Sequence, residues 1–148
     1  MNNESIIFKT KTASEGEIMI HLNLCDDFFS PPLSSRVNID QYAEKIVKNA
    51  ITFEAWNKCE LVGLIAAYLN IENQTSFITN VSVLKEFMGK GISAKLLSNC
   101  FDYLLTNHYK KVDLEVNKSN KKAIDFYKKK IHRNWYYSRF NSDVLFDQ

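Results

Sequence analysis

The chain has 148 residues, 45% of them hydrophobic, and a formal net charge of +2. This size fits a single domain over residues 1–148, with enough apolar surface for a core. No apolar run approaches the roughly 20 residues of a membrane span, and the N-terminus lacks a basic region followed by an apolar one. The three cysteines and three histidines are isolated, without metal-ligand or disulfide spacing. We therefore expect a cytoplasmic globular protein with no metal site and no membrane partner.

The N-terminal third predicts a strand and two helices joined by a loop. Residues 5–12 are strand-like, and a helix is expected to begin near Ser14. Its inward face would carry Ile18, Leu22 and Cys25. The proline pair at 31–32 ends this helix, because proline cannot continue the hydrogen-bond ladder. Asn38, with Gln41 three residues later, resembles a capping box that opens the second helix.

The middle of the chain predicts an antiparallel meander followed by a helix. Residues 51–56 alternate like a half-buried strand, and residues 61–69 are apolar without a break, as in a strand covered on both faces. Residues 76–84 form the third strand after a short turn. After Gly91 the apolar period changes to three and four, which predicts an amphipathic helix. Its apolar face would hold Leu96, Leu97, Cys100, Phe101, Leu104 and Leu105.

The C-terminal part predicts a strand, a helix and a hairpin. Residues 110–116 read as a strand parallel to residues 76–84, because strand, helix and strand imply a right-handed crossover. Residues 119–131 form the next helix, and residues 135–146 a hairpin. The aromatic residues of this hairpin leave open a homodimer interface or simple core packing. The predicted order is β-α-α-β-β-β-α-β-α-β-β, a mixed sheet of the α+β class.

A glycine loop separates the third meander strand from its helix. Such a loop presents unpaired main-chain N–H groups at the positive end of a helix, which suits phosphate, although glycines also merely turn chains. The P-loop spacing is absent, because Leu84 and Gly91 occupy required positions. Gly89, Gly91 and Ala94 do match the dinucleotide fingerprint, but the antiparallel strands before them and the short chain after them argue against that fold.

Two stretches together resemble the GNAT superfamily of acyl-CoA-dependent N-acetyltransferases. Residues 86–91 are similar to its coenzyme A loop, Gln/Arg-x-x-Gly-x-Gly/Ala, with Glu86 where Gln or Arg is usual. Residues 114–131 are similar to the later block of the family, and its Asn, Ala and Tyr positions are matched by Asn120, Ala123 and Tyr127. The Gly-Phe pair that usually follows is absent. The resemblance covers residues 50–140 and implies the GNAT acyl-CoA N-acyltransferase fold, with a splayed parallel strand pair.

The resemblance implies acetyl-CoA as co-substrate and no metal. The pyrophosphate would lie against the main-chain N–H groups of residues 88–92, and pantetheine would lie beside the preceding strand as a pseudo-strand. The cofactor-binding residues expected on this basis are Val81, Ser82, Val83, Met88, Gly89, Lys90, Gly91, Ile92, Ser93, Asn120, Ala123 and Tyr127.

The resemblance also implies catalytic roles for acetyl transfer to a primary amine in a ternary complex. The Val81 N–H would polarise the thioester carbonyl, and Tyr127 would protonate the leaving thiolate. Glu115 would accept the amine proton, with Glu72 or a water chain as the alternative. For Tyr127 the competing interpretation is ordinary packing on the apolar face of a helix. For Glu115 it is a strand-end carboxylate paired with a lysine.

Acceptor recognition is predicted for the loop between the first two helices. Phe28, Phe29 and Arg36 would shape specificity there, and the side chain of Asn80 would line the same site. The acceptor stays open among peptide N-termini, lysine, amino sugars, polyamines and antibiotics. A non-catalytic acyl-CoA-binding module of the same fold is the alternative function. Nucleic acid is not expected as a partner, because the basic stretch at 108–133 lacks interleaved aromatic residues for base stacking.

Overall fold

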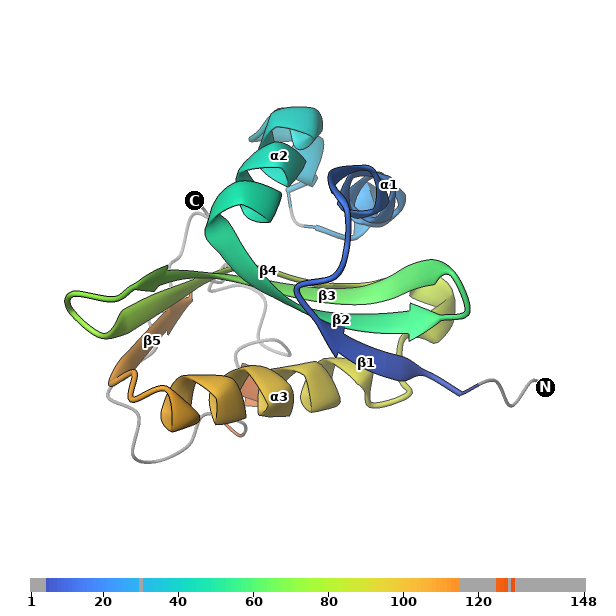
Figure 1. Ribbon diagram of the computed structural model, residues 1–148. Helices are drawn as coiled ribbons and strands as arrows, with labels where there is room; N and C mark the ends of the chain where they lie inside the picture. The colour runs from blue at the N-terminus through green and yellow to red at the C-terminus, as the bar shows by residue number, and fades with distance from the viewer. Residues whose placement is uncertain (1–4, 30, 115–124, 128, 130–148) are drawn as a thin grey trace.

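The computed structural model describes residues 5–29, 31–114, 125–127 and 129. It shows a five-stranded mixed sheet, in the order β1-β2-β3-β4-β5, between two layers of helix (Figure 1). The strands are β1 (Ile7–Thr10), β2 (Ala50–Asn57), β3 (Glu60–Asn70), β4 (Thr75–Val83) and β5 (Lys111–Leu114). The helices are α1 (Glu15–Cys25), α2 (Ile39–Asn49) and α3 (Ile92–Thr106). Three short 3-10 turns are η1 (Asp26–Phe28), η2 (Leu33–Ser35) and η3 (Lys85–Phe87).

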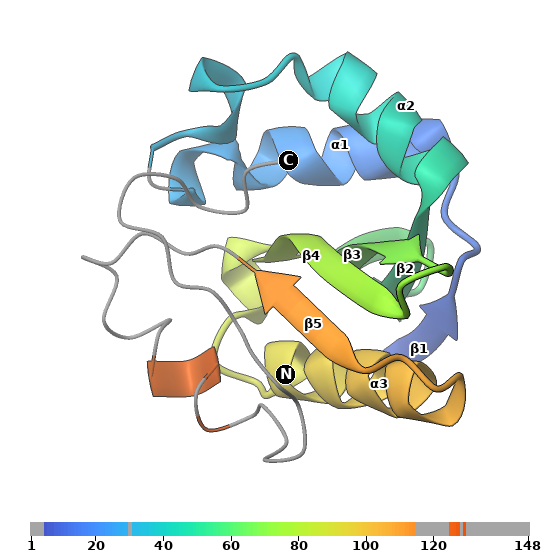
Figure 2. The same cartoon turned by 90° about the vertical axis from the view of Figure 1, so that its left-hand side faces the viewer.

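Strands β1 to β4 run antiparallel to their neighbours, and β5 pairs parallel to β4. Figure 2 shows β5 beside β4 at one edge of the sheet, with α1 and α2 over one face and α3 over the other. The predicted meander, the parallel crossover and the mixed α+β class are therefore confirmed. Residues 125–127 and 129 are helical, as predicted, and the predicted hairpin at 135–146 lies outside the described residues.

Local side-chain caps start the first two helices where the sequence predicts. The Ser14 hydroxyl accepts a hydrogen bond from Glu17 N, and the Glu17 carboxylate accepts one from Ser14 N, which makes a complete capping box. The Asn38 side chain accepts from Gln41 N at 3.0 Å. These caps satisfy main-chain N–H groups that no helical carbonyl can reach.

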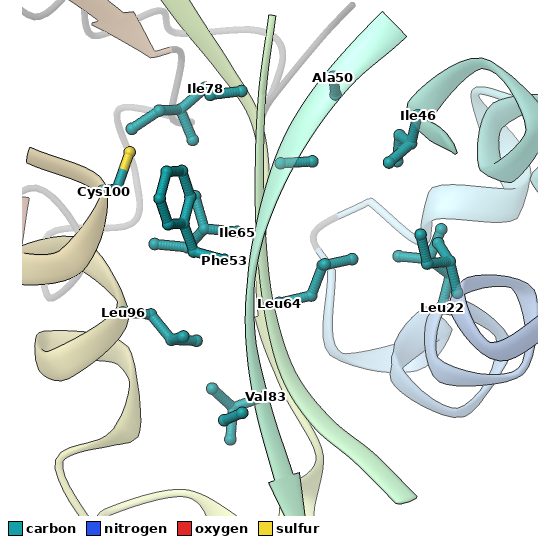
Figure 3. Close-up of a cluster of buried hydrophobic side chains, with 14 of the residues drawn as sticks. Leu22, Ile46, Ala50, Phe53, Leu64, Ile65, Ile78, Val83, Leu96 and Cys100 are labelled. Atoms are coloured by element: carbon teal, nitrogen blue, oxygen red, sulfur yellow. The ribbon is translucent and has the colours of Figure 1, made fainter. Parts of the chain in front are cut away.

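The core lies on both faces of the sheet, as the close-up in Figure 3 shows. Toward α1 and α2 the cluster contains Leu22, Ile46, Ala50 and Leu64. Toward α3 it contains Phe53, Ile65, Ile78, Val83, Leu96 and Cys100. One predicted core position is wrong: Leu105 is 43% exposed, on the outer side of α3.

Strand β2 is buried on both faces from Ala50 to Trp56, whereas the alternation of its residues predicts a half-buried strand. The N-terminal segment at Thr12 and Ala13 hydrogen-bonds to the second face of the strand, and α2 packs against it. Glu54 is the extreme case, because it is 0% exposed and still hydrogen-bonded. Its carboxylate accepts from Thr12 N, Thr12 Oγ1, Ala13 N, Thr52 Oγ1 and Trp56 Nε1, over distances of 2.5 to 3.0 Å.

A β-bulge interrupts β4 at Thr79. Ala66 pairs with Asn80 and Ala67 pairs with Ile78, so Thr79 is the extra residue. Ile78 points toward α3 (Figure 3), and a strictly alternating strand would send Asn80 to the same face. The bulge instead sends Asn80 toward α1 and α2, where its amide contacts Ser82 Oγ. The bulge therefore decides which face of the sheet receives the polar side chains of β4.

No helix among the described residues combines the length and the apolar character needed to cross a bilayer.

Candidate active site

The outer edge of β4 carries main-chain groups that do not face β3. Leu84 N donates to Val62 O at 2.9 Å, which makes these two residues a hydrogen-bonded pair of the antiparallel ladder. Hydrogen-bonded and non-hydrogen-bonded pairs alternate along such a ladder. In the observed register Ser82 therefore faces β3 through its main chain, whereas the N–H and C=O groups of Val81 and Val83 point the other way.

The parallel partner of β4 is described beside the first part of that edge. Within the described residues, β5 pairs with β4 from Thr75 to Ile78 and ends at Leu114. The bulge follows directly at Thr79. The outward main-chain groups of Val81 and Val83 thus lie beyond the end of the described β4–β5 pairing.

The glycine loop connects this edge to the N-terminus of α3. Gly89 and Gly91 have φ values of +78° and +80°, in the left-handed region that favours glycine. Gly91 is the N-cap of α3, and no side chain caps the helix there. The first N–H groups of this 15-residue helix have no intrahelical acceptor, and they carry the positive end of its dipole.

A cavity of about 220 Å³ opens against this loop. It is lined by Val83, Phe87, Met88, Gly89, Gly91, Ile92, Ser93, Ala94 and Phe126. Six of the predicted cofactor residues therefore meet at one cavity, while Lys90 is exposed beside it. Sequence reasoning missed Phe87, Ala94 and Phe126 as lining residues. Phe87 and Ala94 lie within the predicted loop and at the predicted start of the helix. The glycine motif beside them was therefore the sequence signal that could have indicated these two positions.

The close approach of α3 to the sheet depends on Gly63 of β3. A Cβ atom at Gly63 would lie 2.9 Å from Ile92 Cγ2 and 3.1 Å from Leu96 Cδ1. Distances this short force a neighbour to move. Gly63 therefore lets the first turns of α3, and with them the glycine loop, lie directly against β3.

Tyr127 is buried beside the cavity-lining Phe126. It is 5% exposed and belongs to the apolar core, and the two rings meet edge to face with centroids 5.5 Å apart. Burial raises the pKa of the Tyr127 phenol, so the hydroxyl keeps its proton at neutral pH. Of the other residues predicted for catalysis and cofactor binding, Glu115, Asn120 and Ala123 lie outside the described residues.

Glu72, the alternative base, is exposed in the turn between β3 and β4. This turn precedes the N-terminal end of β4 at Thr75, whereas Val81 lies near its C-terminal end. A strand advances about 3.3 Å per residue, so roughly 20 Å of strand separates Thr75 from Val81. The two ends of β4 therefore place Glu72 far from the outward main-chain groups of Val81 and Val83.

The residues predicted for the acceptor lie on the α1 and α2 side of the sheet. Phe28 is 46% exposed, with the Lys85 ammonium 6.0 Å from its ring centroid, while Phe29 is buried in the core. Arg36 is partly buried, and its Nε and Nη2 atoms are buried with no hydrogen-bond partner among the described residues. Asn80 is fully buried. Arg36 and Asn80 both contribute to the electrostatic surroundings of Tyr42, which brings them to one region of the structure.

Among the described residues, no group of three or more His, Cys, Asp or Glu side chains is arranged to hold a metal ion.

A mixed sheet with a glycine loop that opens α3 is typical of an acetyltransferase domain, and the comparison with known families agrees. The chain belongs to the acetyltransferase (GNAT) family, whose model matches residues 18–132.

Solved structures with the same fold have low sequence identity to this chain. An aminoglycoside acetyltransferase from an uncultured soil metagenomic sample, in complex with trehalose, is 18% identical with a TM-score of 0.66, over 90% of this chain and 96% of that one. A GNAT acetyltransferase from Staphylococcus aureus Mu50 is 15% identical with a TM-score of 0.68, over 84% and 82% of the two chains. An IAA acetyltransferase from Bacillus cereus is 19% identical with a TM-score of 0.59, over 84% and 75%.

Proposed function

We propose that this protein is an N-acetyltransferase that transfers the acetyl group of acetyl-CoA to a primary amine. The observation that carries the proposal is the pairing of two features at the C-terminal end of β4. The main-chain groups of Val81 and Val83 face away from β3, and the chain then enters a left-handed glycine loop that opens α3. A strand edge and a free helix N-terminus in succession suit the amides and the pyrophosphate of coenzyme A.

The donor would bind along this edge. Outward main-chain groups at Val81 and Val83 would hydrogen-bond the pantetheine amides, as an added strand does. The pyrophosphate would lie against the N–H groups of residues 88–92, in the cavity that the glycine loop lines. Asn120 and Ala123, in the helix that the sequence predicts at residues 119–131, would complete the coenzyme site, and Lys90 and its neighbours would balance the remaining phosphate charge.

Transfer would proceed by direct attack. The amine nitrogen forms a bond to the thioester carbon, and the carbon–sulfur bond then breaks, with the electron pair leaving on sulfur. The Val81 N–H would donate to the oxygen on which charge develops. Glu115 would take the proton that the amine loses, and Tyr127 would give its proton to the thiolate. Burial raises the pKa of Tyr127, so the phenol carries its proton before the step.

The acceptor would lie on the α1 and α2 side, near Phe28, Phe29, Arg36 and Asn80. Buried guanidinium nitrogens of Arg36 without a partner support a polar acceptor, because buried donors are normally hydrogen-bonded. Aminoglycosides are one candidate class, since a structural neighbour is an aminoglycoside acetyltransferase. The three neighbours named above are under 25% identical to this chain, so a screen must cover peptide N-termini, lysine, amino sugars and polyamines equally.

The experiment combines binding with turnover. Calorimetry with acetyl-CoA should show binding to the wild type, and a thiol-release assay with a panel of amines should identify an acceptor. Tyr127→Phe should then lower kcat roughly 100-fold, the lower part of the range for a general acid. Tyr103→Phe on α3 is the matched control and should leave kcat unchanged.

Three results would count against the proposal. A wild type that does not bind acetyl-CoA would overturn it. Binding without turnover on any amine would favour the non-catalytic acyl-CoA-binding module. Full activity of a folded Tyr127→Phe variant would remove the general-acid role.

A further inference from the structure

Helix α1 carries apolar side chains on two sides. Ile18, Leu22 and Cys25 pack into the core. Ile20 and Leu24, which lie one turn apart on another side of the helix, are 60% and 55% exposed. A helix with one side in the core normally presents polar residues to water on the rest of its surface. The exposed side of α1 is therefore suited to pack against a further apolar surface.

A cavity of about 470 Å³ lies between this side of α1 and the turn that joins β2 to β3. Figure 1 shows α1 over the end of the sheet at which β2 turns into β3. One wall of the cavity comes from the helix and the other from the turn, and the exposed residues on them are Glu17, Ile20, Leu24, Lys58, Cys59 and Glu60. We call this cavity with its two walls the α1 groove. Its volume is large enough to take several side chains of a partner.

The α1 groove carries charges of both signs. Glu17 stands on the helix wall, and its carboxylate is held there because Oε1 accepts a hydrogen bond from Ser14 N in the capping box. Lys58 and Glu60 stand on the wall formed by the turn. Lys58 also interacts within its own chain, so it offers its charge to the groove rather than a free ammonium. An acid and a base on facing walls complement a copy of the same surface better than a partner of one charge sign.

We propose that a second copy of this chain occupies the α1 groove, in a two-fold symmetric dimer in which each α1 lies over the β2–β3 turn of the other subunit. A two-fold axis through the groove brings Ile20 and Leu24 of each chain into the groove of the other, and it brings Glu17 toward Lys58 of the partner subunit. The formal net charge of +2 per chain adds little repulsion between the copies. This interface is separate from the predicted hairpin at 135–146, which lies outside the described residues.

The first test is the oligomeric state of the wild type. Sedimentation equilibrium over a concentration range of about 1 to 500 µM should show a weight-average mass that rises from the mass of one chain to the mass of two. High salt should weaken the association, because part of it is electrostatic. A mass of one chain at every concentration would overturn the proposal and leave the α1 groove to another occupant, such as a peptide.

The apolar contact is tested with Leu24→Glu. This variant should raise the Kd of the dimer roughly 100-fold or more, because each dimer would then bury two carboxylates in the apolar part of the interface. The matched control is Ile71→Glu in the turn between β3 and β4, at the opposite end of β3, where Ile71 is 79% exposed. The control should keep the Kd of the wild type. Equal effects of the two changes, or an unchanged Kd in a folded Leu24→Glu variant, would overturn the proposal.

The charge pair is tested with Glu17→Gln and Lys58→Met. Glu17→Gln removes the charge from the helix wall and keeps the capping box, because glutamine also serves at that position. Each dimer loses two symmetric ion pairs in either variant, so its Kd should rise roughly three- to tenfold. The double variant should be no weaker than either single variant, since both remove the same pair. Losses that multiply in the double variant would overturn the two-fold arrangement.

Cysteine labelling shows where the interface lies. Cys59 is exposed at the α1 groove, whereas Cys25 and Cys100 are buried. Alkylation of Cys59, followed by mass spectrometry, should slow as the wild type dimerises and should stay fast in Leu24→Glu. A dimer in which Cys59 stays unprotected would place the interface elsewhere and overturn the proposal. Neither the mass nor the labelling rate depends on acetyl-CoA or on an amine, so both results are independent of the proposed function.

Discussion

The Tyr42 hydroxyl on α2 contacts two oxygens of Thr79, the bulged residue of β4, at 2.8 Å to the main-chain oxygen and 2.8 Å to Oγ1. Tyr42 is 4% exposed, and burial raises the pKa of its phenol, so the hydroxyl remains a donor across the physiological range. This contact ties the helix layer to the point where β4 changes face. The direction of Asn80 and the outward edge at Val81 both depend on that point.

Tyr42→Phe should therefore affect both stability and rate. The variant leaves Thr79 O and Oγ1 buried without their partner, which should cost about 1–3 kcal/mol of unfolding free energy. Chemical denaturation measures this loss. If the bulge also positions the site, kcat should fall while KM for acetyl-CoA changes little. A stable Tyr42→Phe variant with unchanged kcat would show that the bulge holds without this contact.

Gly91→Ala tests the left-handed N-cap of α3. A side chain at a φ of +80° costs about 1–2 kcal/mol, and relief of that strain would turn the loop N–H groups away from a bound pyrophosphate. We expect the Kd for acetyl-CoA to rise about tenfold in calorimetry. The control is Gly16→Ala in α1, where a new Cβ has no atom within 4 Å. The control should bind normally, and an equal affinity in Gly91→Ala would contradict the placement of the pyrophosphate.

Gly63→Ala tests whether the contact between β3 and α3 sets the position of the loop. The added methyl group would meet Ile92 Cγ2 at 2.9 Å, Leu96 Cδ1 at 3.1 Å and Ala55 Cβ at 3.2 Å. Overpacking of this kind typically costs about 1–3 kcal/mol. Thermal unfolding should show that loss, and KM for acetyl-CoA should rise because the first turn of α3 moves away from the sheet. A loss of stability without a change in KM for acetyl-CoA would show that this contact does not set the position of the loop.

Glu54→Gln tests the buried carboxylate that holds the segment between β1 and α1. Burial by itself would raise the pKa of Glu54, but hydrogen bonds from Thr12, Thr52, Ala13 and Trp56 outweigh it and leave the pKa lowered. In the variant, the N–H₂ group of the glutamine amide would face N–H and O–H groups that donate to the carboxylate in the wild type. Hydrogen bonds to a charged group contribute about 1.5–3 kcal/mol each, so the variant should be clearly destabilised at pH 7.

The pH dependence of that difference follows from the lowered pKa. A carboxylate with a lowered folded-state pKa stabilises the fold above its unfolded value of 4.5, and this contribution is lost as pH falls through the folded-state pKa. The difference in unfolding free energy between wild type and Glu54→Gln should therefore be largest at pH 7 and should decrease below pH 4.5. Glu44→Gln, at an exposed pair with Lys48, is the control. A gap that stays constant down to pH 3 would contradict the role of the charge.

Much of the fold follows from short-range features of the sequence. Apolar periods place the meander and α3, the caps at Ser14 and Asn38 start α1 and α2, and the two glycines mark the N-terminus of α3. These signals act within about four residues, so they can be read without knowledge of the partner segments. Six of the predicted cofactor residues meet at one cavity for the same reason, since they belong to one continuous segment from the last residue of β4 to the first turn of α3.

Other features were decided only by contacts between distant segments. Strict alternation along β4 would place the side chains of Asn80 and Ile78 on the same face of the sheet. The bulge at Thr79, which is defined by the pairing with β3 and contacted by Tyr42, places them on opposite faces. The burial of Glu54 depends on donors more than 40 residues away at Thr12, and the buried ring of His21 contacts Leu61 O and Ser82 Oγ, 40 and 61 residues along the chain. The sequence by itself determined the elements and the loop that opens α3, because those depend on neighbouring residues. The tertiary structure alone decided which polar groups meet beside that loop, because a one-residue shift in register changes the face of every side chain that follows.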